Sequence, residues 1–195
     1  MSDTISELNR IILQARQGKR EAIAQLYQMH TQKIYRYIAY RVTNDADAED
    51  ITAEVFVKMV EGLHTYQITG APFEAWLYRI ASARIIDFRR RGKHRQHDEI
   101  SETMSDDDST PEEYLLEHQE VETLRQALNQ LSDEQQGILV LRFIERKSHQ
   151  EVADILGKSI TAVKSIQHRA LTQLARNLGS EAKVRHYLRG EQQDG

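Results

Sequence analysis

The stretch SHQEVADILGKSITAVKSIQHRAL, residues 148–171, contains two short helical patterns separated by a glycine. Ser148 and Glu151 fit a capping box, in which a serine and a glutamate satisfy backbone donors at the start of a helix. Gly157 supplies the backbone conformation of a turn. The small residues Ala153 and Gly157 allow the two helices to cross closely. The stretch therefore predicts a helix-turn-helix.

The second of these helices, which is expected to begin near Ser159, has two chemically distinct faces when its residues are placed at about 100° intervals. Its apolar half carries Val163, Ile166, Ala170, Leu171 and Leu174. Its polar half carries Thr161, Lys164, Ser165, His168, Arg169 and Thr172. Hydrogen-bonding groups and positive charge are what base edges and phosphates in a major groove require. The polar half is therefore a candidate DNA-reading face, and an ordinary amphipathic hairpin with a solvated face is the alternative.

Helical periodicity extends outward from this motif over most of the 195 residues. Apolar stripes at helical spacing lie at residues 5–12, 23–38, 51–63, 73–88, 115–131 and 184–188. Asn44 is a good N-cap for the third of these helices, and Pro72 suits the first turn of the fourth. Residues 65–71 are expected to form a loop, and Ser132 starts a second capping box. No strand-length alternation competes, so the predicted fold is all-α.

The composition excludes several classes of protein. Cysteine is absent, which rules out disulfide scaffolds, cysteine nucleophiles and thiolate zinc sites. No apolar stretch approaches the ~20 residues of a membrane span, and residues 1–20 lack a secretory signal, so a cytoplasmic protein is expected. The eight histidines are scattered. His94 and His97 lie in a strongly basic setting unsuited to a cation, and His30 lies on an apolar stripe as a core histidine. Neither a metal site nor a cofactor is expected.

The formal net charge of −4 hides a strong segregation of charge along the chain. Residues 1–95 carry +4, residues 96–113 carry −8, and residues 114–195 are neutral. The acidic segment has too few apolar residues to offset the entropy of ordering it. We therefore predict two small helical domains, 1–95 and 114–178, joined by an acidic flexible linker over 96–113 and followed by a tail over 179–195.

The N-terminal half contains one basic and one acidic cluster. The run from Arg84 to Arg95 has six Lys or Arg residues and follows a helix with Phe73 and Trp76. Rings that stack on bases and cations that follow phosphates suit an unpaired or opening DNA strand, whereas a solvated helix end and a core tryptophan are the simpler alternatives. The acidic run 45–50 suits either a helix N-terminus or a docking face for a basic partner.

In combination, these segments resemble the extracytoplasmic-function (ECF) group of bacterial sigma factors, the promoter-recognition subunits of RNA polymerase. The resemblance covers about residues 8–178. The segments that resemble the family's region 2 are residues 47–56, 73–81 and 87–91. The segments that resemble its region 4 are residues 131–135, 141–143, 151–153, 162–165 and 168–171.

The resemblance implies a non-enzymatic protein without cofactors and a division of labour between the two domains. Region 4 would read the −35 element through Ser159, Thr161, Lys164, Ser165, His168 and Arg169. Region 2 would melt the −10 element, where a base is flipped into a pocket, through Tyr66, Trp76, Arg84, Arg89, Arg90 and Arg91. The implied polymerase-docking residues are Asp47, Glu49, Asp50 and Glu54. The implied partners are promoter DNA, the clamp helices and flap of core RNA polymerase, and an anti-sigma protein.

The sequence departs from the family pattern at two positions, and it leaves several alternatives open. Ala53 stands where the family often has Gln on the docking face, and Ala83 stands where it often has Asn in the −10-reading helix. The linker carboxylates either imitate nucleic-acid charge near the polymerase active centre or form a solvated spacer. A helix-turn-helix regulator acting without polymerase would explain residues 137–178 and leave the acidic and basic clusters without a role. A helical interaction module and a hydrolase have less support.

Overall fold

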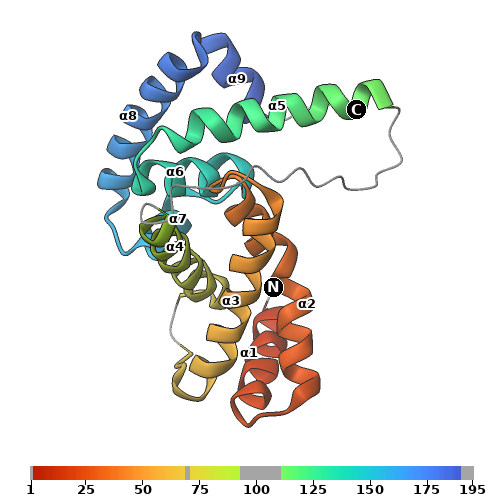
Figure 1. Cartoon of the computed structure of the whole chain (residues 1–195). Helices are drawn as coiled ribbons and strands as arrows, with labels where there is room; N and C mark the ends of the chain where they lie inside the picture. The colour runs from red at the N-terminus through yellow and green to blue at the C-terminus, as the bar shows by residue number, and fades with distance from the viewer. Residues whose placement is uncertain (1, 69–70, 93–110, 190–195) are drawn as a thin grey trace.

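The computed structural model describes residues 2–68, 71–92 and 111–189, and the elements within these ranges are helical (Figure 1). The N-terminal half contains α1 (Ser2–Arg16), α2 (Arg20–Ala39), α3 (Asp45–Gly62), the short 3₁₀ turn η1 (Leu63–Thr65) and α4 (Phe73–Gly92). The C-terminal half contains α5 (Pro111–Asn129), α6 (Asp133–Leu139), the π-helical turn η2 (Val140–Ile144), α7 (His149–Leu156), α8 (Ile160–Leu178) and α9 (Glu181–Arg189).

The helices begin close to where their capping residues predict. The Asn44 side chain accepts a hydrogen bond from the Asp47 backbone N–H at 2.8 Å, at the start of α3. Ser132 and Ser148 both form complete capping boxes. Gly157 has φ +64°, a left-handed conformation that glycine adopts without strain, and it ends α7. The predicted helix-turn-helix is therefore present.

Two boundaries differ slightly from the sequence-based expectation. Pro72 stands just before α4 rather than inside its first turn, and its carbonyl accepts from the Ala75 N–H at 2.9 Å. Helix α5 begins at Pro111, so the last three residues predicted as linker are helical. The rest of that segment, which contains His97, lies outside the described residues, and so does His94 just before it. Proline at a first turn loses no hydrogen bond, which explains why a helix can start there.

The core of the N-terminal half lies where α2, α3 and α4 meet. Leu26, Val55 and Leu77, one from each of these helices, have no exposed surface. His30 is 7% exposed and packs against the Phe73 ring, with the ring centroids 5.5 Å apart, which confirms it as a core histidine. This core holds α3 and α4 side by side, and so it fixes the relative positions of their exposed charges.

The core of the C-terminal half is built from the inner faces of α6, α7 and α8. Ile138, Val152 and Val163 are fully buried there. The tail contributes the predicted short helix, because Val184 and Leu188 of α9 are buried and α9 packs on α8. The Tyr187 side chain, also expected on that stripe, lies outside the described residues.

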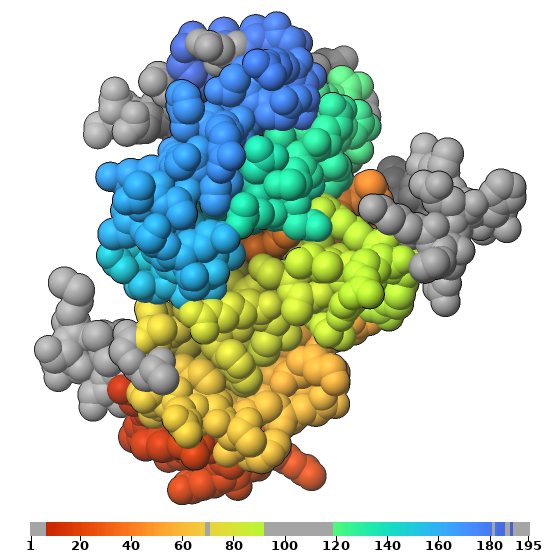
Figure 2. Space-filling model, turned by 90° about the vertical axis from the view of Figure 1, so that its left-hand side faces the viewer, coloured from red at the N-terminus to blue at the C-terminus, as the bar shows by residue number. Residues whose placement is uncertain are grey.

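The two halves pack directly on one another. Figure 2 shows the blue C-terminal half seated on the yellow-green α4. Helix α4 contacts α7, and α2 contacts η2. These contacts join the N-terminal half to the C-terminal half, between elements that lie far apart in the sequence. Two helical domains are the predicted architecture, and the structure adds that the two are in direct contact.

Candidate nucleic-acid interface

Helix α8 presents a continuous polar face to solvent. Val163 and Ala170 are fully buried on its inner side, and Ile166 is buried beside them. The exposed residues on its outer side are Thr161, Lys164, Ser165, His168, Arg169 and Thr172. Ser159 is the N-cap, and its hydroxyl accepts from the Ala162 N–H at 3.1 Å. The outer face is therefore free to meet a ligand, while Ser159 is also committed to starting the helix.

The position of α8 is held by a shared acceptor on its inner edge. The Gln167 side-chain oxygen accepts from Arg142 Nε at 3.2 Å and lies 3.0 Å from His149 Nε2. Arg142 belongs to η2 and His149 to the first turn of α7. One amide thus ties three elements together, which keeps the outer face of α8 in a fixed orientation to the rest of its domain.

Helix α9 adds a cation beside this face that the sequence reasoning did not single out. Arg185 is exposed and lines a cavity of about 240 Å³ together with His168 and Thr172 of α8. Buried Val184 and Leu188 fix α9 there. The apolar spacing of residues 184–188 predicted a short helix in the tail, but it did not predict which side of that helix would face α8.

Aromatic side chains line a cavity of about 300 Å³ between the end of α3 and the start of α4. The Tyr66 ring centroid lies 4.7 Å from that of Trp76 and 5.1 Å from that of Phe73. Burial raises the pKa of Tyr66, so its phenol stays neutral. Arg79 also lines this cavity. Partly buried rings beside a cation form a surface on which a base can stack.

Gly62, the last residue of α3, makes room for this arrangement. A Cβ at Gly62 would lie 2.9 Å from Trp76 Cζ2, which is closer than carbon atoms approach without one of them moving. The indole therefore packs over bare backbone. The need for glycine here comes from this contact and was not visible in the sequence.

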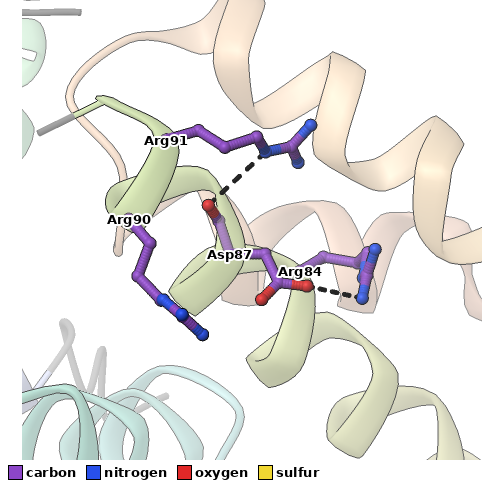
Figure 3. A pocket seen from close by; sticks show the side chains of 4 residues that line it. All are labelled: Arg84, Asp87, Arg90 and Arg91. Carbon is purple, nitrogen blue, oxygen red and sulfur yellow. Dashed lines mark hydrogen bonds and ion pairs between the residues drawn. The ribbon is translucent and has the colours of Figure 1, made fainter. Parts of the chain in front are cut away.

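A basic cavity of about 440 Å³ lies at the C-terminal end of α4, lined by Arg84, Asp87, Arg90 and Arg91 (Figure 3). Arg84 donates to the Asp87 carboxylate at 2.6 Å, and Arg91 Nε donates to the Asp87 carbonyl at 3.4 Å. Three arginines and one aspartate line the cavity, and Glu54 lies 3.5 Å from Arg91, so positive charge still exceeds negative charge here. This is an environment that attracts phosphate oxygens.

Arg89 points away from this cavity, although it lies in the same predicted row of arginines. Its guanidinium donates to the Asp133 carboxylate, to the Gln136 side-chain oxygen at 2.6 Å and to Asn129 Oδ1 at 3.1 Å. Burial lowers the pKa of Arg89. The structure thus brings together Arg84, Arg90 and Arg91 and directs Arg89 to the C-terminal half.

The acidic residues of α3 lie on one side of the N-terminal half. Glu49 and Asp50 are exposed, whereas Asp47 is engaged by Asn44 and Glu54 lies 3.5 Å from Arg91. Burial raises the pKa of Asp47. The exposed side chains that continue this face along α3 are Ala53, Val57 and Val60. Val57 is 55% exposed, and an apolar stripe beside carboxylates is typical of a docking surface.

The described residues contain neither a membrane-spanning helix nor a cluster of metal-ligating side chains. Within residues 2–68, 71–92 and 111–189, no helix is both long and apolar enough to cross a membrane. Over the same ranges, His, Asp and Glu side chains nowhere gather in threes as metal ligands would.

Comparison with known protein families gives two matches along the chain. Residues 26–95 match the family model for sigma-70 region 2, and residues 127–176 match the model for sigma-70 region 4. The aromatic cavity, the basic cavity and the acidic face all lie in the first match. The helix-turn-helix lies in the second. The two matches together cover more than half of the chain.

Curated relatives agree with these matches. RNA polymerase sigma factor YlaC of Bacillus subtilis is 35% identical over 162 residues, which cover 82% of this chain and 93% of that protein. ECF RNA polymerase sigma factor BldN of Streptomyces coelicolor is 33% identical over 175 residues, which cover 89% of this chain and 66% of that protein.

A solved structure shares the fold. CnrH, in complex with the cytosolic domain of CnrY, is similar with a TM-score of 0.66 and 23% identity, over 87% of this chain and 95% of that one. At this identity the likeness concerns the fold alone. The two family models and the curated relatives point to the same family, the shared fold is consistent with it, and the two matched regions fall in the two helical domains. The chain therefore belongs to the sigma-70 family, and within it to the ECF RNA polymerase sigma factors, which are DNA-binding regulators rather than enzymes.

Proposed function

We propose that region 4 of this sigma factor reads the −35 promoter element with the outer face of α8. The exposed hydrogen-bonding and cationic side chains of α8 support this proposal: Thr161, Lys164, Ser165, His168 and Arg169. An exposed helix with such side chains fits a major groove, where bases are distinguished by hydrogen bonds and held in register by phosphate contacts. Ser159 would contribute through the start of the helix. Arg185 of α9 would add a phosphate contact at the edge of the same face.

We infer that region 2 opens and holds the −10 element. The observation that carries this inference is the pair of cavities on α4, one aromatic around Tyr66 and Trp76 and one basic around Arg84, Arg90 and Arg91. Unstacking a base costs a few kcal/mol, which ring surfaces and phosphate contacts can offset. Arg89 would join this set once it leaves its partners in region 4.

The exposed face of α3 is our candidate for docking on the clamp helices of core RNA polymerase. Glu49 and Asp50 would supply charge, with Asp47 and Glu54 beside them, and Val57 would supply apolar surface. The family's frequent glutamine is replaced by Ala53 in the middle of this face, so the contact here would be made by packing rather than by an amide. Region 4 would contact the polymerase flap.

Regulation by an anti-sigma protein is part of this proposal. Among the solved structures that share the fold, the sigma factor RpoE from Bartonella quintana is in complex with the anti-sigma factor NepR. A partner of that kind would bind this chain across its two domains. Because core polymerase and promoters are found in the bacterial cytoplasm, the proposed place of action is the cytoplasm. The acidic segment over 96–113 is proposed as the tether between domains 1–95 and 114–178.

Reconstituted transcription tests the proposed function. The purified chain is added to core RNA polymerase that lacks sigma, and transcription is measured from a library of promoters randomised at the −35 and −10 positions. We expect transcripts only from promoters that share two short elements. Binding to DNA without binding to core polymerase, or transcription that ignores both elements, would favour the regulator that acts without polymerase.

A matched pair of variants tests the docking face. Val57→Asp places a charge at the centre of the exposed stripe of α3 and should weaken binding to core polymerase about tenfold or more. Glu21→Gln changes an exposed residue on α2, outside this face, and should bind core polymerase as the wild type does. Equal affinities of the two variants would remove α3 from the interface.

A further inference from the structure

Glu145 is a buried carboxylate whose side-chain donors come from the other domain. Its side chain is only 1% exposed. Arg36 binds both of its oxygens, from Nε at 2.6 Å and from Nη2 at 3.1 Å, and the Tyr78 hydroxyl donates to Oε2 at 3.1 Å. Burial raises the pKa of Tyr78, so the phenol remains a donor. The hydrogen bonds that Arg36 donates to the Glu145 carboxylate raise the pKa of Arg36. Region 4 thus places a charge inside a site built by region 2.

A second contact between the domains occupies Arg89. Asp133 and Gln136 of region 4 accept from its guanidinium, as described above. Next to it, Arg41 is 1% exposed and donates from Nη2 to the Asp133 backbone carbonyl at 3.1 Å. Because Arg89 is one of the arginines expected to hold the opening strand, this contact occupies and partly buries a cation that DNA would need.

A third contact occupies Arg79, at the rim of the aromatic cavity. Its guanidinium donates from Nε to the Ile155 carbonyl at 2.8 Å and also to the Asp154 carbonyl, at the last turn of α7. The last carbonyls of a helix carry partial negative charge, so a cation is stabilised there. The same side chain lines the cavity with Tyr66 and Trp76. Arg79 is exposed and lines the cavity, but its guanidinium is already hydrogen-bonded to region 4.

These contacts share one chemistry. Carboxylate and carbonyl oxygens of region 4 take the places that phosphate oxygens would take on the same guanidinium groups. We propose that region 4 acts as an internal competitor of DNA: it closes onto region 2, occupies Arg79 and Arg89, and is latched there by Glu145 on Arg36 and Tyr78. This inference rests on the proposed function, since DNA must need the two occupied arginines.

The latch is suited to reversible opening. The Glu145 carboxylate is buried, whereas the Arg36 side chain is 43% exposed. The attraction between the two is largely cancelled by the cost of removing the carboxylate from water, so the net contribution of the pair to closure is small. Arg146, directly after the latch residue, has φ +54°, a left-handed conformation that costs a non-glycine residue energy. A DNA strand offers many phosphates at once, and it can therefore displace a few carboxylates and carbonyls.

A distance measurement on the full chain tests the latch. The natural chain has no cysteine, so Ala24→Cys on α2 and Arg176→Cys on α8 place two spin labels at exposed positions of the two domains. We expect a single short distance in this labelled chain. Glu145→Gln keeps the size of the side chain and removes its charge, and it should shift a measurable fraction of molecules to longer distances.

Two further variants make the result specific. Glu134→Gln removes a carboxylate that pairs with Lys158 inside region 4, and it should leave the distance unchanged. The exchange Arg36→Glu with Glu145→Arg should restore closure that either single change weakens. A Glu145→Gln chain that stays closed would overturn the latch, and so would opening that the Glu134→Gln control shows equally.

A DNA-binding measurement tests whether region 4 and DNA compete for region 2. The probe is a fluorescein-labelled 20-nucleotide single strand that contains the −10 sequence found in the transcription assay, read by anisotropy at constant salt. Glu145→Gln should bind this strand about fivefold or more tightly than the wild type, because a larger fraction is open. The strand should also lengthen the distance in the wild type. Opening without tighter binding would overturn the competition.

The proposed function and this inference can fail separately. The spin-label distances concern the chain alone, so they test the latch whether or not the chain supports transcription with core polymerase. Loss of transcription in the reconstituted assay would overturn the proposed function. Unchanged distances in all latch variants of a transcriptionally active protein would overturn only the inference.

Discussion

At the scale of single residues, His30 shows how burial sets a chemical property. Neither ring nitrogen of His30 has a hydrogen-bond partner. Burial lowers its pKa from 6.5 to about 4, against a smaller raising effect of Glu74, while Lys33 and Lys147 lower it further. The histidine is therefore neutral in the folded protein at pH 7. Protonating it requires a charge to enter the core of region 2.

This burial predicts a loss of stability in acid. Between pH 6.5 and about pH 4 the unfolded chain binds a proton at His30, whereas the folded chain does not. The free energy of unfolding therefore falls as the pH falls. By pH 4 the loss approaches about 3 kcal/mol. His30→Leu should lose less stability than the wild type across this window. Urea unfolding at a series of pH values measures the difference, and parallel curves would show that His30 does not contribute.

Gly62 predicts a second effect at the scale of a residue. In Gly62→Ala the new methyl group must displace the Trp76 ring, which lines the aromatic cavity. Overpacking of this kind costs about 1–3 kcal/mol, more than alanine gains over glycine at the end of a helix. Because Trp76 is the single tryptophan of the chain, its fluorescence reports the displacement directly.

A neighbouring substitution supplies the control for Gly62. Glu61→Ala changes an exposed side chain that pairs with Lys58 on the same helix. It should leave both the tryptophan emission and the urea midpoint close to those of the wild type. If Gly62→Ala behaved in the same way, the close approach of the indole would not constrain this position.

At the scale of elements, the faces of α8 predict two kinds of DNA contact. If Arg169 reads a base, Arg169→Ala should cost about 1–3 kcal/mol and relax the sequence preference at one −35 position. If Lys164 meets a phosphate, Lys164→Ala should weaken all −35 sequences alike and reduce the salt slope by about one. Affinities of the sigma–polymerase complex for variant promoters, measured at several salt concentrations, separate the two roles.

Helix α9 leads to a related prediction for a residue outside the helix-turn-helix. Arg185→Ala should reduce the salt dependence of promoter binding without changing which −35 sequence is preferred, because Arg185 flanks the reading face rather than forming part of it. Lys183→Ala removes a neighbouring exposed cation that does not line this cavity and serves as the comparison. A changed −35 preference in Arg185→Ala would mean that the side chain enters the groove.

Local patterns predicted the helices and the outward face of α8, because caps, turn glycines and apolar spacing act within a few residues. They did not predict the direction of Arg89. Three consecutive arginines at 100° intervals point in three directions, and only the packed structure decides which one meets Asp133. The same holds for Arg185, whose place beside His168 depends on how α9 packs.

At the scale of the whole molecule, the sequence predicted two helical domains but not their contact. The contact is made by pairs far apart along the chain, such as Arg36 with Glu145 and Arg79 with the end of α7. No local pattern specifies such pairs, because each partner taken alone looks like an ordinary surface charge. The average charge of the chain was equally uninformative, since its acidic excess is concentrated between the two domains.

The seating of Arg79 on the last carbonyls of α7 has a consequence for heat denaturation. A helix end that is capped by another domain loses its cap when that domain melts, so the two halves should melt cooperatively. Scanning calorimetry of the wild type should show one peak with equal calorimetric and van't Hoff enthalpies. Arg79→Ala should split or broaden this peak, while a wild type that already melts in two steps would show that the halves are thermodynamically independent.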